Sequence, residues 1–181
     1  MQRGNLGAGR VGASMRVRDA GIAVAWMLML AATPAGAAEI VRTPLPDGST
    51  FPIAAAVEVP AGRSLVFLSG MVPPVADRDA PPNTVDAYGD TKTQATAVLA
   101  AIDTQLQALG LTLGDVVKMQ VFLVGDPRRD GRMDTNGFMD AWKRYFGTDE
   151  QPNLPARSLV QVAALANPGY LVEVEVTAVR P

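Results

Sequence analysis

"YLVEVEVTAV", Tyr170 to Val179, alternates apolar and polar residues with the period of two that is typical of a β-strand. One face carries only apolar residues, which suits packing beneath helices: Val172, Val174, Val176 and Ala178. The other face mixes carboxylates with apolar and hydroxyl groups: Leu171, Glu173, Glu175, Thr177 and Val179. Since such a mixture suits neither a core nor a solvated surface, we expect another copy of the protein to cover it.

Further strands are predicted upstream of this one. "DVVKMQVFLV", Asp115 to Val124, has one continuous apolar face, and "PARSLVQVAAL", Pro155 to Leu165, has the length and composition of a strand. Two shorter strand-like runs, Ile53 to Val59 and Leu65 to Ser69, are separated by "PAGR". Because Pro and Gly favour turn geometry, we interpret these two runs as a hairpin.

Two stretches have helical periodicity. The apolar positions of the first are Val98, Leu99, Ile102, Leu106 and Leu109. They predict a helix from Thr84 or Ala87 to Leu109, which ends before Gly110. The second carries an aromatic stripe that we interpret as a core face: Phe138, Trp142 and Tyr145. Together these elements predict an α/β fold of the α+β sandwich type, in which two helices cover one face of a mainly antiparallel sheet.

Composition limits the chemistry that the chain can perform. The 181 residues fit one domain, and they include no His and no Cys. Triads that depend on His or Cys, thiolate or imidazole metal sites and disulfides are therefore excluded. The net charge of −2, without a basic run, argues against nucleic acid as a partner. "GAGRVG", Gly7 to Gly12, matches a dinucleotide-binding pattern but lacks a preceding strand, so we expect no cofactor and no metal.

The N-terminal region predicts export. "MRVRDAGIAVAWMLMLAATPAGAAE", Met15 to Glu39, has two arginines, an apolar run and the small residues "AGA" at a cleavage position. The apolar run, Gly21 to Ala32, is shorter than the about 20 residues that a membrane-spanning helix needs. We therefore predict a signal peptide and N-terminal extension at 1–37, and a periplasmic or secreted domain at 38–181 without stable membrane insertion after cleavage. An uncleaved membrane anchor is the alternative.

Arg157 is the one charged residue in the otherwise uncharged run "LPARSLVQV", Leu154 to Val162. A buried guanidinium needs compensation, because an unpaired buried charge costs several kcal/mol. Glu173 or Glu175 could neutralise it permanently in a structural salt bridge. Alternatively, its planar fork of donors could await the carboxylate of a ligand.

Four segments, in this order, resemble the Rid family, the YjgF-like reactive intermediate deaminases. They are "LVFLSGMVP", "ALGLTLGDVVKMQVFL", "WKRYFG…LPARSLVQVAAL" and "VEVEVTAVRP". The resemblance covers about Ile53 to Pro181 and implies a homotrimer of a chorismate-mutase-like fold with a six-stranded sheet. It also implies ligand sites at subunit interfaces. The expected activity is hydrolysis of 2-imino or enamine acids to 2-keto acids and ammonia, without a cofactor.

The resemblance also implies roles for single residues. Arg157 would bind the substrate carboxylate, Glu173 would position the water as the catalytic residue, and Ser69 and Gly70 would complete the pocket. Three positions depart from the pattern of deaminating members, which have tyrosine, asparagine and cysteine there: Ile53, Met139 and Leu159. Because these departures change the pocket wall, a non-enzymatic trimer that binds small carboxylates or a protein is the alternative function.

Overall fold

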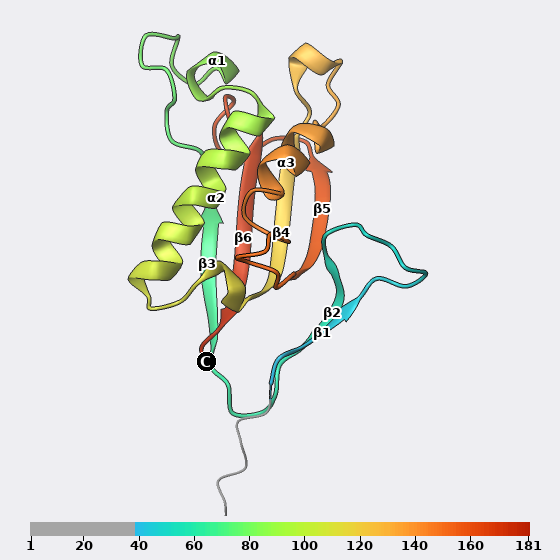
Figure 1. Ribbon diagram of the computed structural model, residues 1–181. Helices are drawn as coiled ribbons and strands as arrows, with labels where there is room; N and C mark the ends of the chain where they lie inside the picture. Colours follow the sequence, from blue (N-terminus) through green and yellow to red (C-terminus); the bar gives the residue numbers. More distant parts are fainter. Residues whose placement is uncertain (1–38) are drawn as a thin grey trace, which may run out of the picture. The chain divides into compact units, whose positions relative to one another are not determined.

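The computed structural model describes residues 39–181 and contains a six-stranded sheet with the strand order β1-β2-β5-β4-β6-β3 (Figure 1). The strands are β1 (Val41–Pro44), β2 (Ala54–Glu58), β3 (Leu65–Met71), β4 (Val116–Val124), β5 (Ala156–Val162) and β6 (Val172–Val179). The predicted signal peptide at 1–37 lies outside the described residues. Within the described part of the chain, no helix has both the length and the apolar character needed to cross a bilayer.

The sheet is mixed but mainly antiparallel, as predicted, since three of its five strand pairs are antiparallel. β5 pairs in parallel with both β2 and β4, whereas β1–β2, β4–β6 and β3–β6 are antiparallel. The parallel pairing of β4 with β5 follows from the long connection between them, which returns the chain to the end of the sheet where β4 began.

The predicted hairpin between the two N-terminal runs is wrong. β2 pairs with β1 and β5, and β3 pairs with β6 at the opposite edge of the sheet. The hairpin partner of β2 is β1, which the sequence analysis did not identify. "PAGR" does contain a turn, at Ala61 and Gly62, but this turn lies in the connection from β2 to the edge strand β3 and does not join a hairpin. Arg42 of β1 fastens this hairpin, because its guanidinium donates to the carbonyls of Gly114, Val116 and Leu154 at 2.8–3.0 Å.

The helices are α1 (Val85–Tyr88), α2 (Thr91–Ala108) and α3 (Thr135–Trp142), with 3-10 turns η1 (Leu113–Asp115) and η2 (Pro127–Arg129). The first predicted helix is interrupted at Gly89, where φ is +84°, and the Asp90 carboxylate caps α2 by accepting from the Thr93 N–H at 2.8 Å. Gly110 follows α2 with φ of +71°, as predicted. Figure 1 shows α2 and α3 on the same face of the sheet.

The core lies between α2, α3 and this face of the sheet. The predicted apolar positions of α2 from Val98 to Leu106 are fully buried, as are Phe138 and Trp142 of α3. Tyr145 is only half-buried and follows α3 instead of belonging to it. The apolar face of β6 is confirmed, while Leu171 and Val179, predicted on its other face, are also buried at the ends of the strand.

Gln94 is the polar residue that joins α2 to β6. Its side chain is fully buried; Nε2 donates to the carbonyls of Gly89 and Gly169 at 2.9 Å, and Oε1 accepts from the Leu171 N–H at 2.7 Å. These bonds satisfy backbone groups that water cannot reach, and they fix the start of α2 against the turn before β6.

We expect Gln94→Leu to lower the free energy of unfolding by about 3 kcal/mol, because it leaves buried backbone groups without partners. Chemical denaturation measures this loss. Gln107→Leu is the matched control, since that exposed side chain bonds only to Asp103 on the same helix. Equal effects of the two substitutions would contradict the proposed role of Gln94.

Candidate functional site

The register of the sheet decides which predicted site residues share a face. Arg157 lies opposite Met119, which is fully buried beneath the helices, whereas Glu173 lies opposite Phe122. Directly opposite residues of neighbouring strands point to the same side of a sheet, and successive residues alternate. Arg157 therefore points to the helix-covered face and Glu173 to the other face, so one subunit does not bring them together.

Aromatic rings surround the Arg157 guanidinium. Its Cζ lies 4.4 Å from the ring centroid of Trp142, 5.4 Å from that of Phe138 and 5.5 Å from that of Phe51. Nη2 donates to Sδ of Met139 at 3.3 Å, and Nη1 is buried without a hydrogen-bond partner. Among the described residues, no carboxylate forms an ion pair with Arg157, so a structural salt bridge with Glu173 or Glu175 is absent within the subunit.

Burial lowers the pKa of Arg157 from its usual value to about 10, and the group remains cationic at neutral pH. Contacts with aromatic faces compensate part of the lost hydration, since the negative face of each ring attracts a cation. The thioether sulfur of Met139 is a weak hydrogen-bond acceptor, so it replaces little of the remaining lost hydration. A cation in this state gains most from an anion that offers two oxygen acceptors, which is the geometry of a carboxylate.

A hollow lies beside Phe51 and Met139, two of the residues that contact this arginine. It has a volume of about 650 Å³ and is lined by residues 48–52, Asn136, Met139 and Lys143. Phe51 and Met139 line the hollow, and both also contact the Arg157 guanidinium. Ile53 lines a neighbouring hollow of about 340 Å³ that also contains Phe51, and Leu159 is half-buried against the core.

Ser69 and Gly70 lie at an irregularity in β3, on the opposite face from Arg157. The register between β3 and β6 shifts between Leu68 and Met71, as at a β-bulge. The Gly70 backbone packs so closely on the Glu173 carboxylate that a Cβ at this position would collide with Oε1. The absence of a side chain at Gly70 therefore lets the backbone reach this carboxylate.

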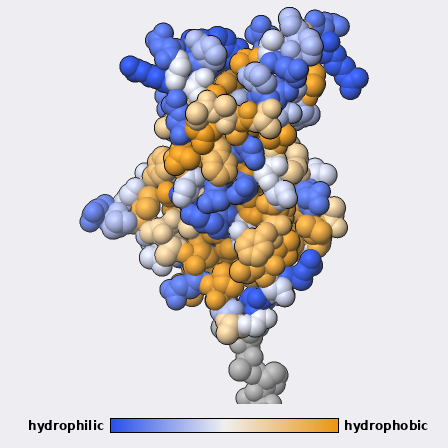
Figure 2. All heavy atoms as spheres, turned by 180° about the vertical axis from the view of Figure 1, so that it is seen from behind, coloured by the Kyte–Doolittle hydropathy of each residue, from blue (hydrophilic) through white to orange (hydrophobic). Residues whose placement is uncertain are grey.

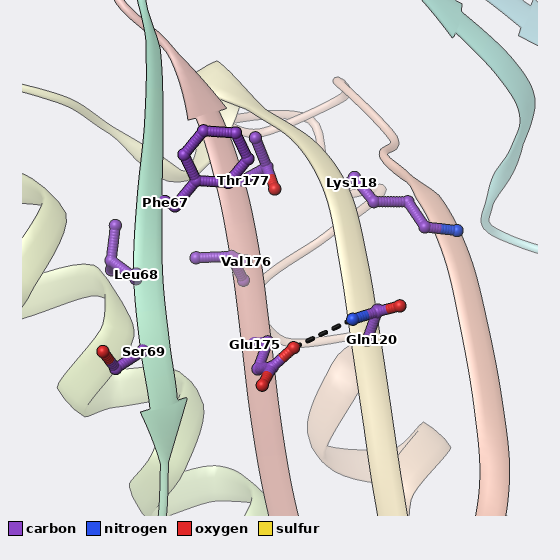
Figure 3. Close-up of a pocket in the computed structure, with 8 residues that line it drawn as sticks. All are labelled: Phe67, Leu68, Ser69, Lys118, Gln120, Glu175, Val176 and Thr177. Carbon is purple, nitrogen blue, oxygen red and sulfur yellow. Dashed lines mark hydrogen bonds between the residues drawn. The ribbon is translucent and has the colours of Figure 1, made fainter.

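Ser69 shares a hollow with Glu175 instead of Glu173. Figure 3 shows this hollow, which has a volume of about 420 Å³, with Lys118 and Gln120 of β4 beside it. Gln120 Nε2 donates to Glu175 Oε2 at 2.8 Å, and Lys118 Nζ donates to the Ser158 hydroxyl at 3.1 Å. Of the predicted site residues, Ser69, Gly70 and Glu173 thus lie on the uncovered face of the sheet, and Arg157 lies on the helix-covered face.

The face that carries Glu173 has much exposed apolar surface. Phe67 is 73% exposed, and Leu65 and Val160 are 47% and 45% exposed. Figure 2 views the molecule from behind and shows apolar areas around a polar centre. Large exposed apolar areas of this kind mark interaction surfaces.

Sequence reasoning missed two features of the site. Phe51 was not singled out, although an aromatic residue beside Pro52 just before a strand could have marked it. Phe138 and Trp142 were interpreted only as core residues, and they also contact the guanidinium. Within residues 39–181, no cluster of His, Cys, Asp or Glu side chains could hold a metal ion.

Comparisons with known proteins agree with this fold. The family model described as "Endoribonuclease L-PSP" matches residues 49–180. TdcF of Escherichia coli K12 is 32% identical over 145 residues, which cover 78% of this chain and 97% of TdcF. A 2-iminobutanoate/2-iminopropanoate deaminase of Salmonella typhimurium is 33% identical over 119 residues, which cover 65% of this chain and 80% of that protein.

Solved structures lead to the same family. YyfB of Yersinia pestis, a Rid protein of unknown function, matches with a TM-score of 0.56 and 25% identity over 76% of this chain and 96% of its own. Escherichia coli TdcF with bound serine matches with a TM-score of 0.50 and 29% identity over 80% of this chain and all of its own. The chain belongs to the Rid family, also known as the YjgF or L-PSP family.

We expect Arg157→Met to leave the free energy of unfolding unchanged or to raise it by up to about 1 kcal/mol, because the substitution removes an unpaired buried charge. Arg42→Met is the control, because its guanidinium donates to three carbonyls. That variant should lose about 2 kcal/mol in the same denaturation experiment. A comparable loss for both variants would identify Arg157 as a structural residue.

Proposed function

We propose that this protein hydrolyses reactive 2-imino or enamine acids to 2-keto acids and ammonia without a cofactor. The observation that carries the proposal is the Arg157 guanidinium, which is cationic, partly buried against aromatic rings and without a carboxylate partner in its own subunit. The relative from Salmonella typhimurium is named for imine deamination, which supports the same chemistry. The family model carries an endoribonuclease name, but an acidic chain without His offers little for RNA binding or cleavage.

The active unit is a homotrimer with composite sites at its interfaces. Within one subunit, Arg157 and Glu173 lie on opposite faces of the sheet. A neighbouring subunit that covers the exposed apolar face would remove its Phe67 and Leu65 from water. The same contact would bring Ser69, Gly70 and Glu173 of one subunit to Arg157 of the next, which completes the site.

The chemistry needs orientation more than a strong nucleophile. Arg157 holds the substrate carboxylate in a bidentate pair, and Glu173 positions a water beside the electrophilic imine carbon. The water oxygen bonds to this carbon while Glu173 accepts a proton and passes it to the nitrogen. The hydroxyl proton of this adduct then moves to the nitrogen, again through Glu173, and the C–N bond breaks as the oxygen forms the ketone. One water and one imino acid thus give one keto acid and one ammonia.

The second candidate is a non-enzymatic trimer that binds small carboxylates or a protein. The changed residues of the pocket wall, Ile53, Met139 and Leu159, favour it. Release of ammonia from an imino acid generated in solution separates the two functions, since the binding protein would give no increase above the uncatalysed rate.

We expect Arg157→Ala to abolish binding of 2-keto acids and Glu173→Gln to keep binding but release ammonia at least about tenfold more slowly. Co-expression of both variants tests the composite site. Random trimers built from equal amounts place intact Arg157 beside intact Glu173 at about one quarter of the interfaces. The mixture should therefore recover about one quarter of the wild-type rate of ammonia release.

Light scattering on each sample provides the control for assembly. Wild type and all variants should have the mass of three subunits. A mixture that stays inactive although its trimers form would place both residues in one subunit's site, and a monomeric wild type at micromolar concentration would contradict the interfacial site altogether.

We also propose that the protein is exported and that its mature form begins near Ala38. The support is the sequence pattern of residues 15–39 alone. N-terminal sequencing of the protein from its native host should find Ala38 or a close neighbour. Recovery of an intact Arg16 to Ala32 segment from the cytoplasm would contradict export.

A further inference from the structure

We propose that the site selects substrates with large apolar side chains, preferably aromatic ones, and that Phe51 and Met139 set this preference. The proposal rests on the proposed function only in that Arg157 anchors the carboxylate of the ligand. It concerns the other end of that ligand and names the class of 2-imino and 2-keto acids that the site accepts best.

Phe51 and Met139 lie between the arginine and the hollow. Both side chains contact the guanidinium, and both line the hollow of about 650 Å³ beside it. The side chain of a 2-imino acid begins two bonds from its carboxylate carbon. A ligand whose carboxylate replaces the weak thioether contact at Nη2 therefore directs its side chain along these two residues.

The side chains of these two residues favour contact with apolar groups, aromatic ones above all. Phe51 is 45% exposed, so one face or edge of its ring is free to contact a ligand. Aromatic pairs gain from offset or edge-to-face contact beyond the burial of area. Met139 adds a flexible, polarisable chain that adapts to irregular apolar shapes and makes favourable contacts with rings. An aryl group would cover both, whereas a methyl group would leave the Phe51 ring in water.

The size of the hollow points the same way. The names of the Salmonella relative's substrates, 2-iminobutanoate and 2-iminopropanoate, denote side chains of two carbons and one carbon. In the single subunit, the hollow of about 650 Å³ has room for a larger side chain than these. Lys143 at its edge is exposed, so its charge is screened and gives a second carboxylate on the ligand little advantage.

Calorimetry on the full trimer tests the preference with three stable 2-keto acids: phenylpyruvate, pyruvate and 2-oxoglutarate. Wild type should bind phenylpyruvate at least about tenfold more tightly than pyruvate. Phe51→Ala should reduce this ratio to within about twofold, because it weakens the binding of phenylpyruvate more than the binding of pyruvate. Met139→Asn should shift the ratio in the same direction, because a polar amide replaces part of the apolar wall.

Two further samples complete the design. Val75→Ala is the matched control. Val75 is an apolar residue about as exposed as Phe51, and it lies outside the two hollows that Phe51 lines. The ratio of its affinities for phenylpyruvate and pyruvate should equal that of wild type. Rates of ammonia release from the imines of phenylalanine and alanine, generated in solution by an amino-acid oxidase, should follow the same order. Thermal melts check that each variant is folded.

The outcomes separate this proposal from the proposed function. Equal affinities for phenylpyruvate and pyruvate, tighter binding of 2-oxoglutarate, or an equal loss for both ligands in Phe51→Ala would overturn the preference. Such results would leave deamination untouched. A clear preference for phenylpyruvate without any ammonia release would uphold the specificity and reject the deaminase activity in favour of a binding protein.

Discussion

The parallel pairing of β4 with β5 is the constraint on which the rest of the structure depends. Parallel neighbours cannot be joined by a tight turn, so the chain between them must cross one face of the sheet. α3 lies on this connection and places Phe138, Met139 and Trp142 over β5. The surroundings of Arg157 are thus a direct product of topology: the strand that carries the arginine and the helix that encloses it are joined by one crossover.

The same arrangement divides the functional groups between two faces. Helices occupy one side of the sheet, so the alternation of β6 sends Glu173 and Glu175 to the uncovered side. The proposed deamination needs a cation and a carboxylate at one carbon, so under that proposal a second subunit would complete the site. Assembly and chemistry would then be one requirement, and the contact would also cover Phe67, which is 73% exposed in the single subunit.

Sequence periodicity predicted what depends on local alternation and burial. The faces of β4 and β6, the apolar stripe of α2 and the end of α2 before Gly110 all follow from spacing. Pairing between distant strands does not, and the false hairpin arose because two adjacent runs with a Pro-Gly turn resemble one. For the site, family motifs predicted Arg157, Glu173, Ser69 and Gly70, whose functional roles stay predictions. The opposite faces of Arg157 and Glu173 required the register, and Phe51 required the contact geometry.

The attachment of the β1–β2 hairpin differs from that of the rest of the sheet. Ala54 opposite Ala156 is its one register pair with β5, and side-chain hydrogen bonds supply further attachments, from Arg42 and from Trp142 Nε1 to the Pro52 carbonyl at 3.0 Å. Segments held by few contacts open locally at a lower free energy than global unfolding. Phe51 lies in the loop of this hairpin, so this wall of the hollow is held by fewer backbone pairs than Arg157, whose strand pairs with β4 along its whole length. Amide hydrogens of the β1–β2 hairpin would then exchange faster than those of β4 and β5. A ligand could enter the hollow through movement of this hairpin, without any disturbance of the core.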